Sequence, residues 1–169
     1  MKKKIIITGG LGYIGTELCK LYSGVSWHHN ITVIDNRFIS ERVNQIRNWN
    51  MEFVQGDILD KDLIKKYCYD ADVVHHLAGI TDVPRTKSEA SELHDKKIKE
   101  VGEKGTQNIL DAINERCKIV FPSTHVVYEG INEVKTDIKE DENTKPVLSY
   151  ASSKAINEDQ LKKSGKNFV

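Results

Sequence analysis

A tyrosine and a lysine stand four residues apart near the end of the chain, at Tyr150 and Lys154. On a helix this spacing places both side chains on one face. A tyrosine becomes a useful base at pH 7 only if its pKa falls by roughly 3 units, which takes about 4 kcal/mol of preferential stabilisation of the phenolate. A neighbouring ammonium group supplies stabilisation of that kind. By itself the spacing says little, because many helices carry it, so the surrounding elements decide its meaning.

A pair of hydroxyl side chains follows the apolar run that precedes this segment. Residues 118–121 read Lys-Ile-Val-Phe, and Ser123 and Thr124 come after Pro122. The carboxyl ends of parallel strands form the ligand-facing edge of an open α/β sheet. We therefore expect Thr124 to hydrogen-bond the same substrate oxygen as Tyr150, and the candidate catalytic residues are Thr124, Tyr150 and Lys154.

The segment that would hold a cofactor lies at the start of the chain. A four-residue run of apolar, β-branched residues, 5–8, stops at a glycine cluster, and a helical pattern begins at residue 13. The glycines at 10, 12 and 15 fit G-x-G-x-x-G, while those at 9, 12 and 15 fit G-x-x-G-x-x-G. In either register they allow a tight turn, close approach of a pyrophosphate to the backbone and close packing of helix on strand. Free N–H groups at the start of the helix would then face the phosphates.

A carboxylate ends the second apolar strand pattern, over residues 31–35. Asp35 lies 20 positions after Gly15, where an acidic residue is needed to bind the adenosine ribose hydroxyls. A glycine-rich turn without a ligand is the alternative interpretation, and Asp35 argues against it. The combination predicts a site for NAD. We expect a preference for NAD over NADP, because the Asp35 carboxylate would repel the 2′-phosphate of NADP.

The third and fourth strand patterns end in residues suited to the same ligand. Asp57 and Ile58 follow the strand at 51–54, where Asp57 would accept a hydrogen bond from the adenine amino group and Ile58 would cover the ring. The alternative is that Asp57 caps the next helix. The strand at 72–76 runs into small residues that let the cofactor lie against the backbone. The candidate cofactor-binding residues are Gly9, Gly12, Tyr13, Ile14, Gly15, Asp35, Asn36, Asp57, Ile58, Leu77, Ala78, Gly79, Tyr150 and Lys154.

The alternation of short apolar strands with helical patterns predicts an α/β fold, a three-layer Rossmann-type doubly wound parallel sheet. We expect one NAD-binding domain over residues 1–169, with a helix that opens on a serine cap at Ser149 and the start of a sixth strand at 166–169. A long charged helix is expected over 86–114. Gly102 and Gly105 each weaken it by roughly 1 kcal/mol against alanine, which predicts close packing there. Its charges indicate a solvated face, and a homodimer contact is the alternative.

Composition narrows the classes of function. The chain has 25 basic and 25 acidic side chains and no net charge, so no basic excess indicates nucleic-acid binding. No apolar stretch reaches membrane length. Three dispersed cysteines form no C-x-x-C pair, and the histidines at 28 and 29 have no partner at ligand spacing, so we expect no metal site. These features are typical of a cytoplasmic protein.

Taken together, the motifs resemble the extended short-chain dehydrogenase/reductase family, in its NAD-dependent nucleotide-sugar epimerase/dehydratase group. The matching segments are, in chain order, residues 8–15, 34–36, 56–58, 76–79, 105–108, 123–124 with 127–128, and 150–154. The resemblance implies that Tyr150 is the acid/base, that Lys154 binds the nicotinamide ribose and approaches the tyrosine, and that Thr124 is the hydroxyl partner. It also implies hydride exchange between NAD and a sugar carbon of a nucleotide sugar, taken to be a UDP-sugar.

Departures from the family pattern narrow the expected reaction. His125 and Val126 stand where the dehydratases of the family carry an Asp-Glu pair, so the acid needed for elimination is missing and the pattern is closest to UDP-galactose 4-epimerase-like enzymes. Gly102 stands where the family usually has an asparagine. Family members also continue into a C-terminal substrate-binding part that these 169 residues lack. The alternatives are a non-catalytic or truncated NAD-binding module and a nucleotide-sugar ketoreductase.

Overall fold

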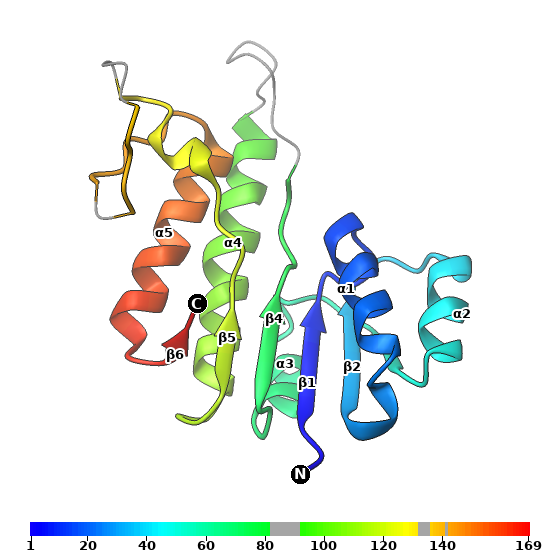
Figure 1. Cartoon of the computed structure of the whole chain (residues 1–169). Helices are drawn as coiled ribbons and strands as arrows, with labels where there is room; N and C mark the ends of the chain where they lie inside the picture. Colours follow the sequence, from blue (N-terminus) through cyan, green and yellow to red (C-terminus); the bar gives the residue numbers. More distant parts are fainter. Residues whose placement is uncertain (82–91, 132–135, 141) are drawn as a thin grey trace.

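The structure is a computed structural model of the chain that describes residues 1–81, 92–131, 136–140 and 142–169. Within those residues six parallel strands form one sheet in the order β3-β2-β1-β4-β5-β6 (Figure 1). The strands are β1 (Lys4–Thr8), β2 (Asn30–Asp35), β3 (Glu52–Gln55), β4 (Val73–His76), β5 (Lys118–Val120) and β6 (Asn167–Phe168). The predicted parallel doubly wound sheet is confirmed.

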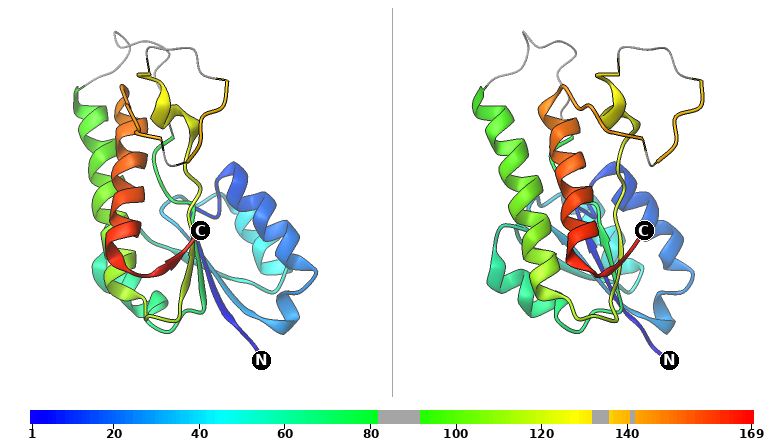
Figure 2. Two further views of the ribbon diagram at one scale, coloured as in Figure 1. Left: turned by 60° about the vertical axis from the view of Figure 1, so that its left-hand side comes forward. Right: turned by 90° about the vertical axis from the view of Figure 1, so that its left-hand side faces the viewer.

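Helices cover both faces of this sheet and make it a three-layer structure. The helices are α1 (Tyr13–Ser23), α2 (Ser40–Asn48), α3 (Lys61–Cys68), α4 (Glu92–Ala112) and α5 (Ser149–Ser164), with 3-10 turns η1 (Ser26–His28) and η3 (His125–Tyr128). Helices α1 and α2 lie on one face, and α3, α4 and α5 lie on the other (Figure 2). None of the helices in the described ranges has the length and apolar character needed to cross a membrane.

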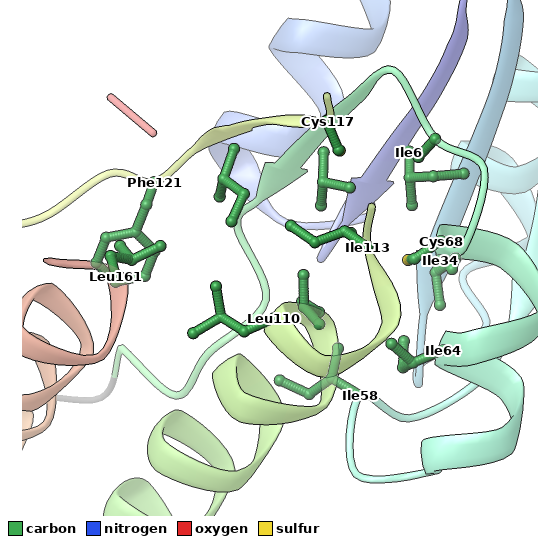
Figure 3. Packing of buried hydrophobic residues seen from close by; sticks show 14 residues of the cluster. Ile6, Ile34, Ile58, Ile64, Cys68, Leu110, Ile113, Cys117, Phe121 and Leu161 are labelled. Carbon is green, nitrogen blue, oxygen red and sulfur yellow. The ribbon is translucent and has the colours of Figure 1, made fainter. Parts of the chain in front are cut away.

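Alternation along the buried strands divides the core into two clusters. Ile6 and Ile34 face α3, α4 and α5, where they pack with residues such as Ile64, Leu110 and Leu161 (Figure 3). Ile5, Ile7 and Val33 face the other way and pack against Cys19 of α1 and against Val43 and Ile46 of α2. Strands covered on both faces are apolar throughout, which explains the continuous isoleucine run of β1.

The order of the strands places a crevice beside β1. This strand pairs with β2 on one side and with β4 on the other, so that Thr8 lies opposite both Ile34 and His76. From β1 the chain continues to β2 and β3 on one side of this strand, and it then crosses to β4, β5 and β6 on the other side. Ligands of such sheets bind at the carboxyl ends of the strands where the order reverses. The glycine turn after Thr8 therefore opens onto the crevice.

Two details of the helices bear on the sequence predictions. The serine cap expected for α5 is wrong: Ser149 is its first helical residue, and the N-cap Leu148 makes no side-chain capping bond. Instead, Glu129 Oε1 accepts from the backbone N–H groups of Val147 (2.7 Å) and Leu148 (2.6 Å) just before the helix. In α4 the described helix begins at residue 92, so the part of the expected helix at 86–91 lies outside the described residues.

Candidate functional site

A cavity of about 740 Å³ opens at the carboxyl edge of the sheet between the ends of β1 and β4. Every residue that the sequence nominates for the cofactor lines it, from Gly9 and its neighbours to Tyr150 and Lys154. Arg37, Lys97 and Ser123 also line it, although the sequence did not single them out for cofactor binding. One cavity thus joins the glycine turn to the tyrosine and lysine of α5.

The glycine turn takes the G-x-x-G-x-x-G register at the cavity. Gly9 has φ +68°, and a Cβ there would lie 2.7 Å from the backbone Cα of Ala78, so the left-handed turn and the approach of the β4 end both require glycine. Gly10 does not line the cavity, and a Cβ there would lie 2.2 Å from Cγ1 of Val33. Gly10 therefore serves the packing of the turn on the sheet.

Helix α1 begins at this turn, and its first residues line the cavity. Its N-cap is Gly12, which has extended backbone (φ −72°, ψ 176°) and no side chain that could cap the helix. The first N–H groups of a helix, here those of Tyr13 and Ile14, have no intrahelical acceptor. Such a helix end fits a pyrophosphate, since its N–H groups and its dipole both favour an anion.

Asp35, at the end of β2, is buried and fully engaged. Its Oδ2 accepts from the backbone N–H of Leu11 (2.9 Å), and its Oδ1 accepts from the backbone N–H of Arg37 (3.0 Å). The Arg37 guanidinium also reaches both oxygens, with Nε 3.2 Å from Oδ1 and Nη2 3.4 Å from Oδ2. Arg37 is a site residue that the sequence reasoning missed, and a cation two positions after the acid was the available signal.

Asp57 holds its place at the cavity wall without capping a helix. Its Oδ1 accepts from the backbone N–H of Leu59 (3.0 Å), and its Oδ2 accepts from Nδ2 of Asn36 (3.3 Å). The cap of α3 is Asp60, whose side chain accepts from the backbone N–H of Leu63 (3.0 Å). The capping alternative for Asp57 is therefore wrong, and its carboxylate lies in the lining of the cavity.

At the other end of the cavity, Tyr150 and Lys154 come from the first turns of α5. Burial raises the pKa of Tyr150, while a hydrogen bond with Thr124 acts in the opposite direction. Lys154 Nζ donates to the carbonyl of Pro122 (2.9 Å) and lies 4.3 Å from the centre of the Phe121 ring. The structure brings Thr124 and Tyr150 together, but the expected lowering of the pKa of Tyr150 by Lys154 is not seen.

Lys154 itself is strongly perturbed. Burial lowers its pKa to about 8, and the opposite charge of Glu158 offsets only part of this effect. Glu158 also accepts a hydrogen bond from Ser123, which lines the cavity. The ammonium group therefore sits in a place where a new polar partner would stabilise its charge.

A buried histidine supports the floor of the crevice. His76 Nδ1 is hydrogen-bonded to Thr8 Oγ1 and Nε2 to Thr106 Oγ1, both at 3.0 Å. Thr8 Oγ1 also accepts from the backbone N–H of Ala78 (3.2 Å). Burial, with a smaller contribution from the charge of Lys154, lowers the pKa of His76 to about 3, so the ring is neutral. The sequence reasoning did not assign His76 a role.

Gly102 and Gly105 allow close packing of α4, as predicted. A Cβ at Gly105 would lie 2.2 Å from Cδ1 of Ile58, and a Cβ at Gly102 would lie 2.0 Å from Oγ of Ser153. The carbonyl of Gly102 also accepts from Nδ2 of Asn157 in α5 (3.0 Å). Gly102, which stands where the family usually has an asparagine, therefore lies at a close contact between α4 and α5.

In the described part of the chain, no group of three or more His, Cys, Asp or Glu residues could hold a metal ion.

Comparison with known proteins gives the family of the chain and enzymes to which it is similar. The model of the 3-beta hydroxysteroid dehydrogenase/isomerase family matches residues 6–169. A UDP-N-acetyl-alpha-D-glucosaminuronate decarboxylase of Bacillus cytotoxicus is 35% identical over 130 residues, covering 76% of this chain and 38% of that protein.

Solved structures extend the comparison to the fold. A UDP-N-acetylglucosamine 4-epimerase from Methanobrevibacter ruminantium M1, in complex with UDP-N-acetylmuramic acid, has a TM-score of 0.78 and 29% identity, covering 99% of this chain and 54% of that one. A UDP-glucose 4-epimerase from Brucella ovis, in complex with NAD, has a TM-score of 0.77 and 28% identity, covering 97% and 49%. The chain thus spans about half the length of these structures.

Proposed function

We propose that this chain, which belongs to the 3-beta hydroxysteroid dehydrogenase/isomerase family, binds NAD and functions as a nucleotide-sugar epimerase of the 4-epimerase kind. The observation that carries the proposal is the single cavity that joins the glycine turn and Asp35 to Tyr150 and Lys154. A dinucleotide needs an anion site and a ribose site at one end and a reacting group at the other. The cavity offers all three. The similar 4-epimerases, one of them crystallised with NAD, support the same assignment.

The residues present fit the cofactor. The N-terminus of α1 is suited to the pyrophosphate, because no side chain caps its backbone donors and the turn residues that line the cavity, Gly9 and Gly12, have no side chains. Asp35 is suited to the adenosine ribose and Asp57, beside Ile58, to the adenine. Lys154 would hold the nicotinamide ribose. When bound, NAD supplies an acceptor and donor for hydride at a sugar carbon.

The acid–base work falls to Tyr150. In the proposed reaction its side chain takes the proton from the sugar hydroxyl and later returns it, while Thr124 orients the shared oxygen. Because burial raises the pKa of Tyr150 in this structure, stabilisation of the phenolate has to come from a charge that approaches it. Lys154 is one helical turn away and can supply that charge if it leaves the Pro122 carbonyl.

An epimerase fits the site better than a dehydratase. The residues after Thr124 are His125 and Val126, which begin η3, so no carboxylate follows Thr124 directly to assist an elimination. Epimerisation needs only the tyrosine, the hydroxyl and a retained cofactor. The family resemblance leaves a ketoreductase and a non-catalytic NAD-binding module as the alternatives.

Calorimetry with NAD and a coupled epimerase assay with UDP-sugars test the proposal. We expect Tyr150→Phe to reduce turnover at least a hundredfold and to change NAD affinity by less than about threefold, since general acid–base catalysis contributes about 10²–10⁴ in rate. Tyr69→Phe is the matched control, because Tyr69 is exposed and does not line the cavity. A folded chain that binds no NAD would overturn the proposal. NAD binding without turnover would favour the non-catalytic module, and more than a few per cent of activity in Tyr150→Phe would require another base.

A further inference from the structure

We propose that Arg37 sets how strongly the site distinguishes NAD from NADP, and that it lets the chain accept the 2′-phosphate that Asp35 alone would exclude. The inference rests on the proposed dinucleotide site. It concerns the guanidinium group at the adenosine end of the cavity, which the expectation drawn from Asp35 did not consider.

The first step is that Asp35 has no acceptor position to spare. An ionised carboxylate offers about four lone-pair positions on its two oxygens. Here all four are used: Oδ1 accepts from the backbone N–H and Nε of Arg37, and Oδ2 accepts from the backbone N–H of Leu11 and Nη2 of Arg37. Ribose hydroxyls can therefore reach Asp35 only by displacing the Arg37 guanidinium.

The second step is that the guanidinium can move. The Arg37 side chain is 55% exposed, whereas that of Asp35 is 4% exposed. The two side-chain contacts are 3.2 and 3.4 Å long, which is at or beyond the long end of hydrogen bonds to oxygen. The backbone donors of Leu11 and Arg37 hold the carboxylate in place whether or not the guanidinium stays.

The third step is where a displaced guanidinium goes. Its Nη2 already lies 3.8 Å from the position that a Cβ of Gly12 would take, so it borders the turn at the start of α1. Arg37 also lines the cavity. A phosphate on the 2′-oxygen would extend from the ribose toward this region, and a planar guanidinium can bind a phosphate with two parallel hydrogen bonds.

The charges then decide the preference. A carboxylate about 4 Å from a phosphate charge, at an effective dielectric of 20, would weaken NADP binding by roughly a thousandfold. A cation at a similar distance offsets most of this penalty, although its exposure to solvent reduces the effect. We therefore expect NAD and NADP to bind the native chain with dissociation constants within about tenfold of each other.

Titration calorimetry with NAD and NADP, on the native chain and three variants, tests the inference without any enzyme assay. Arg37→Ala should raise the ratio of the NADP to the NAD dissociation constant at least tenfold, with NAD itself bound as well as before or slightly more tightly. Arg37→Lys keeps the charge but not the paired donors of the guanidinium, and should raise the ratio less than Arg37→Ala does. Arg47→Ala removes the same charge from an exposed position of α2 that does not line the cavity, and should leave the ratio unchanged.

The outcomes separate the inference from the proposed function. If neither dinucleotide binds a folded native chain, the proposed function fails and the inference fails with it. If NAD binds but Arg37→Ala leaves the ratio within twofold of native, the inference alone is wrong. An equal gain in affinity for both dinucleotides in Arg37→Ala would show that the arginine only obstructs Asp35, and that result also overturns the inference.

Discussion

We predict that Lys154 makes the affinity for NAD dependent on pH, and the size of this dependence follows from the environment of the lysine. Burial lowers the pKa of this lysine to about 8 in the free chain. If its ammonium group binds the nicotinamide ribose, the new hydrogen bonds favour the charged form and return the pKa toward its ordinary value. Protonation and NAD binding are then coupled. As the pH rises through 8, the free chain loses the proton that the complex requires.

The magnitude follows from the position of that pKa. With a pKa of about 8, roughly nine-tenths of the free chain carries the ammonium at pH 7 and roughly one-tenth at pH 9. The affinity for NAD should therefore fall about tenfold between pH 7 and pH 9, which corresponds to about 1.4 kcal/mol. At pH 8 binding should take up about half a proton. The buried cysteines do not interfere, because burial raises their pKa values to about 11 or 12.

Calorimetry at pH 7, 8 and 9, in pairs of buffers with different ionisation enthalpies, measures both the affinity and the proton uptake. Lys154→Arg is the matched variant, because arginine stays charged throughout this range. It should bind NAD with an affinity that does not change with pH, even if the overall affinity is lower. A native chain whose NAD affinity is constant from pH 7 to pH 9 would refute the reasoning, since the ammonium would then be either absent from the ribose or not destabilised by burial.

Two further predictions concern the elements that shape the crevice. In Gly15→Ala the new Cβ would lie 2.5 Å from the carbonyl oxygen of Gly9, so overpacking should cost about 1–3 kcal/mol of stability and weaken NAD binding at least tenfold by displacing α1. Gly24→Ala is the control and should leave NAD binding unchanged, because its backbone is helical and no atom lies within 4 Å of the position that its Cβ would take. If thermal unfolding showed that the two variants are equally stable, the packing argument would be contradicted. His76 has a pKa of about 3 in the native chain and a higher pKa in the unfolded chain, so unfolding takes up a proton when the pH lies between the two pKa values. The free energy of unfolding should therefore decrease by about 1.4 kcal/mol per pH unit as the pH falls from about 6 to 4. His76→Gln should reduce this slope in urea unfolding curves and leave a smaller part from His75, whose pKa burial also lowers. An unchanged slope would mean that the His76 ring is not buried as a neutral group.

The sheet and the outline of the crevice could be predicted because their signals are local. Within a few residues, the isoleucine run before Gly9 predicts both a strand and its ligand-facing end. The apolar strand that ends at Asp35 does the same. The strand order then follows from the doubly wound pattern. The close packing at Gly102 and Gly105 was predictable for a similar reason, because glycine is unfavourable inside a helix unless another element comes near.

Interactions between distant residues were not predictable from the pattern. The start of α5 is held by Glu129, 20 residues before Ser149, so a serine at the first position looked like the cap. His76 is neutral because it is buried, and the hydrogen-bond partners of its ring, Thr8 and Thr106, come from two other elements. Lys154 turns to a backbone carbonyl of the loop after β5, a contact that the spacing to Tyr150 does not contain.

The polar groups of the cavity indicate where the affinity for a dinucleotide must come from. Asp35 is occupied by Arg37 and by backbone donors, Asp57 by Asn36 and a backbone donor, and Lys154 by the Pro122 carbonyl. A ligand that binds Asp35 or Asp57 exchanges one hydrogen bond for another, and such exchanges contribute little net free energy. At Lys154 the ligand also stabilises the ammonium that burial disfavours, which is the source of the pH dependence. At the N-terminus of α1, by contrast, no side chain caps the helix, so a phosphate would not have to displace a side-chain partner there. The pyrophosphate site should therefore supply most of the affinity, while the side chains at the two ends determine which dinucleotide is bound and how it is oriented.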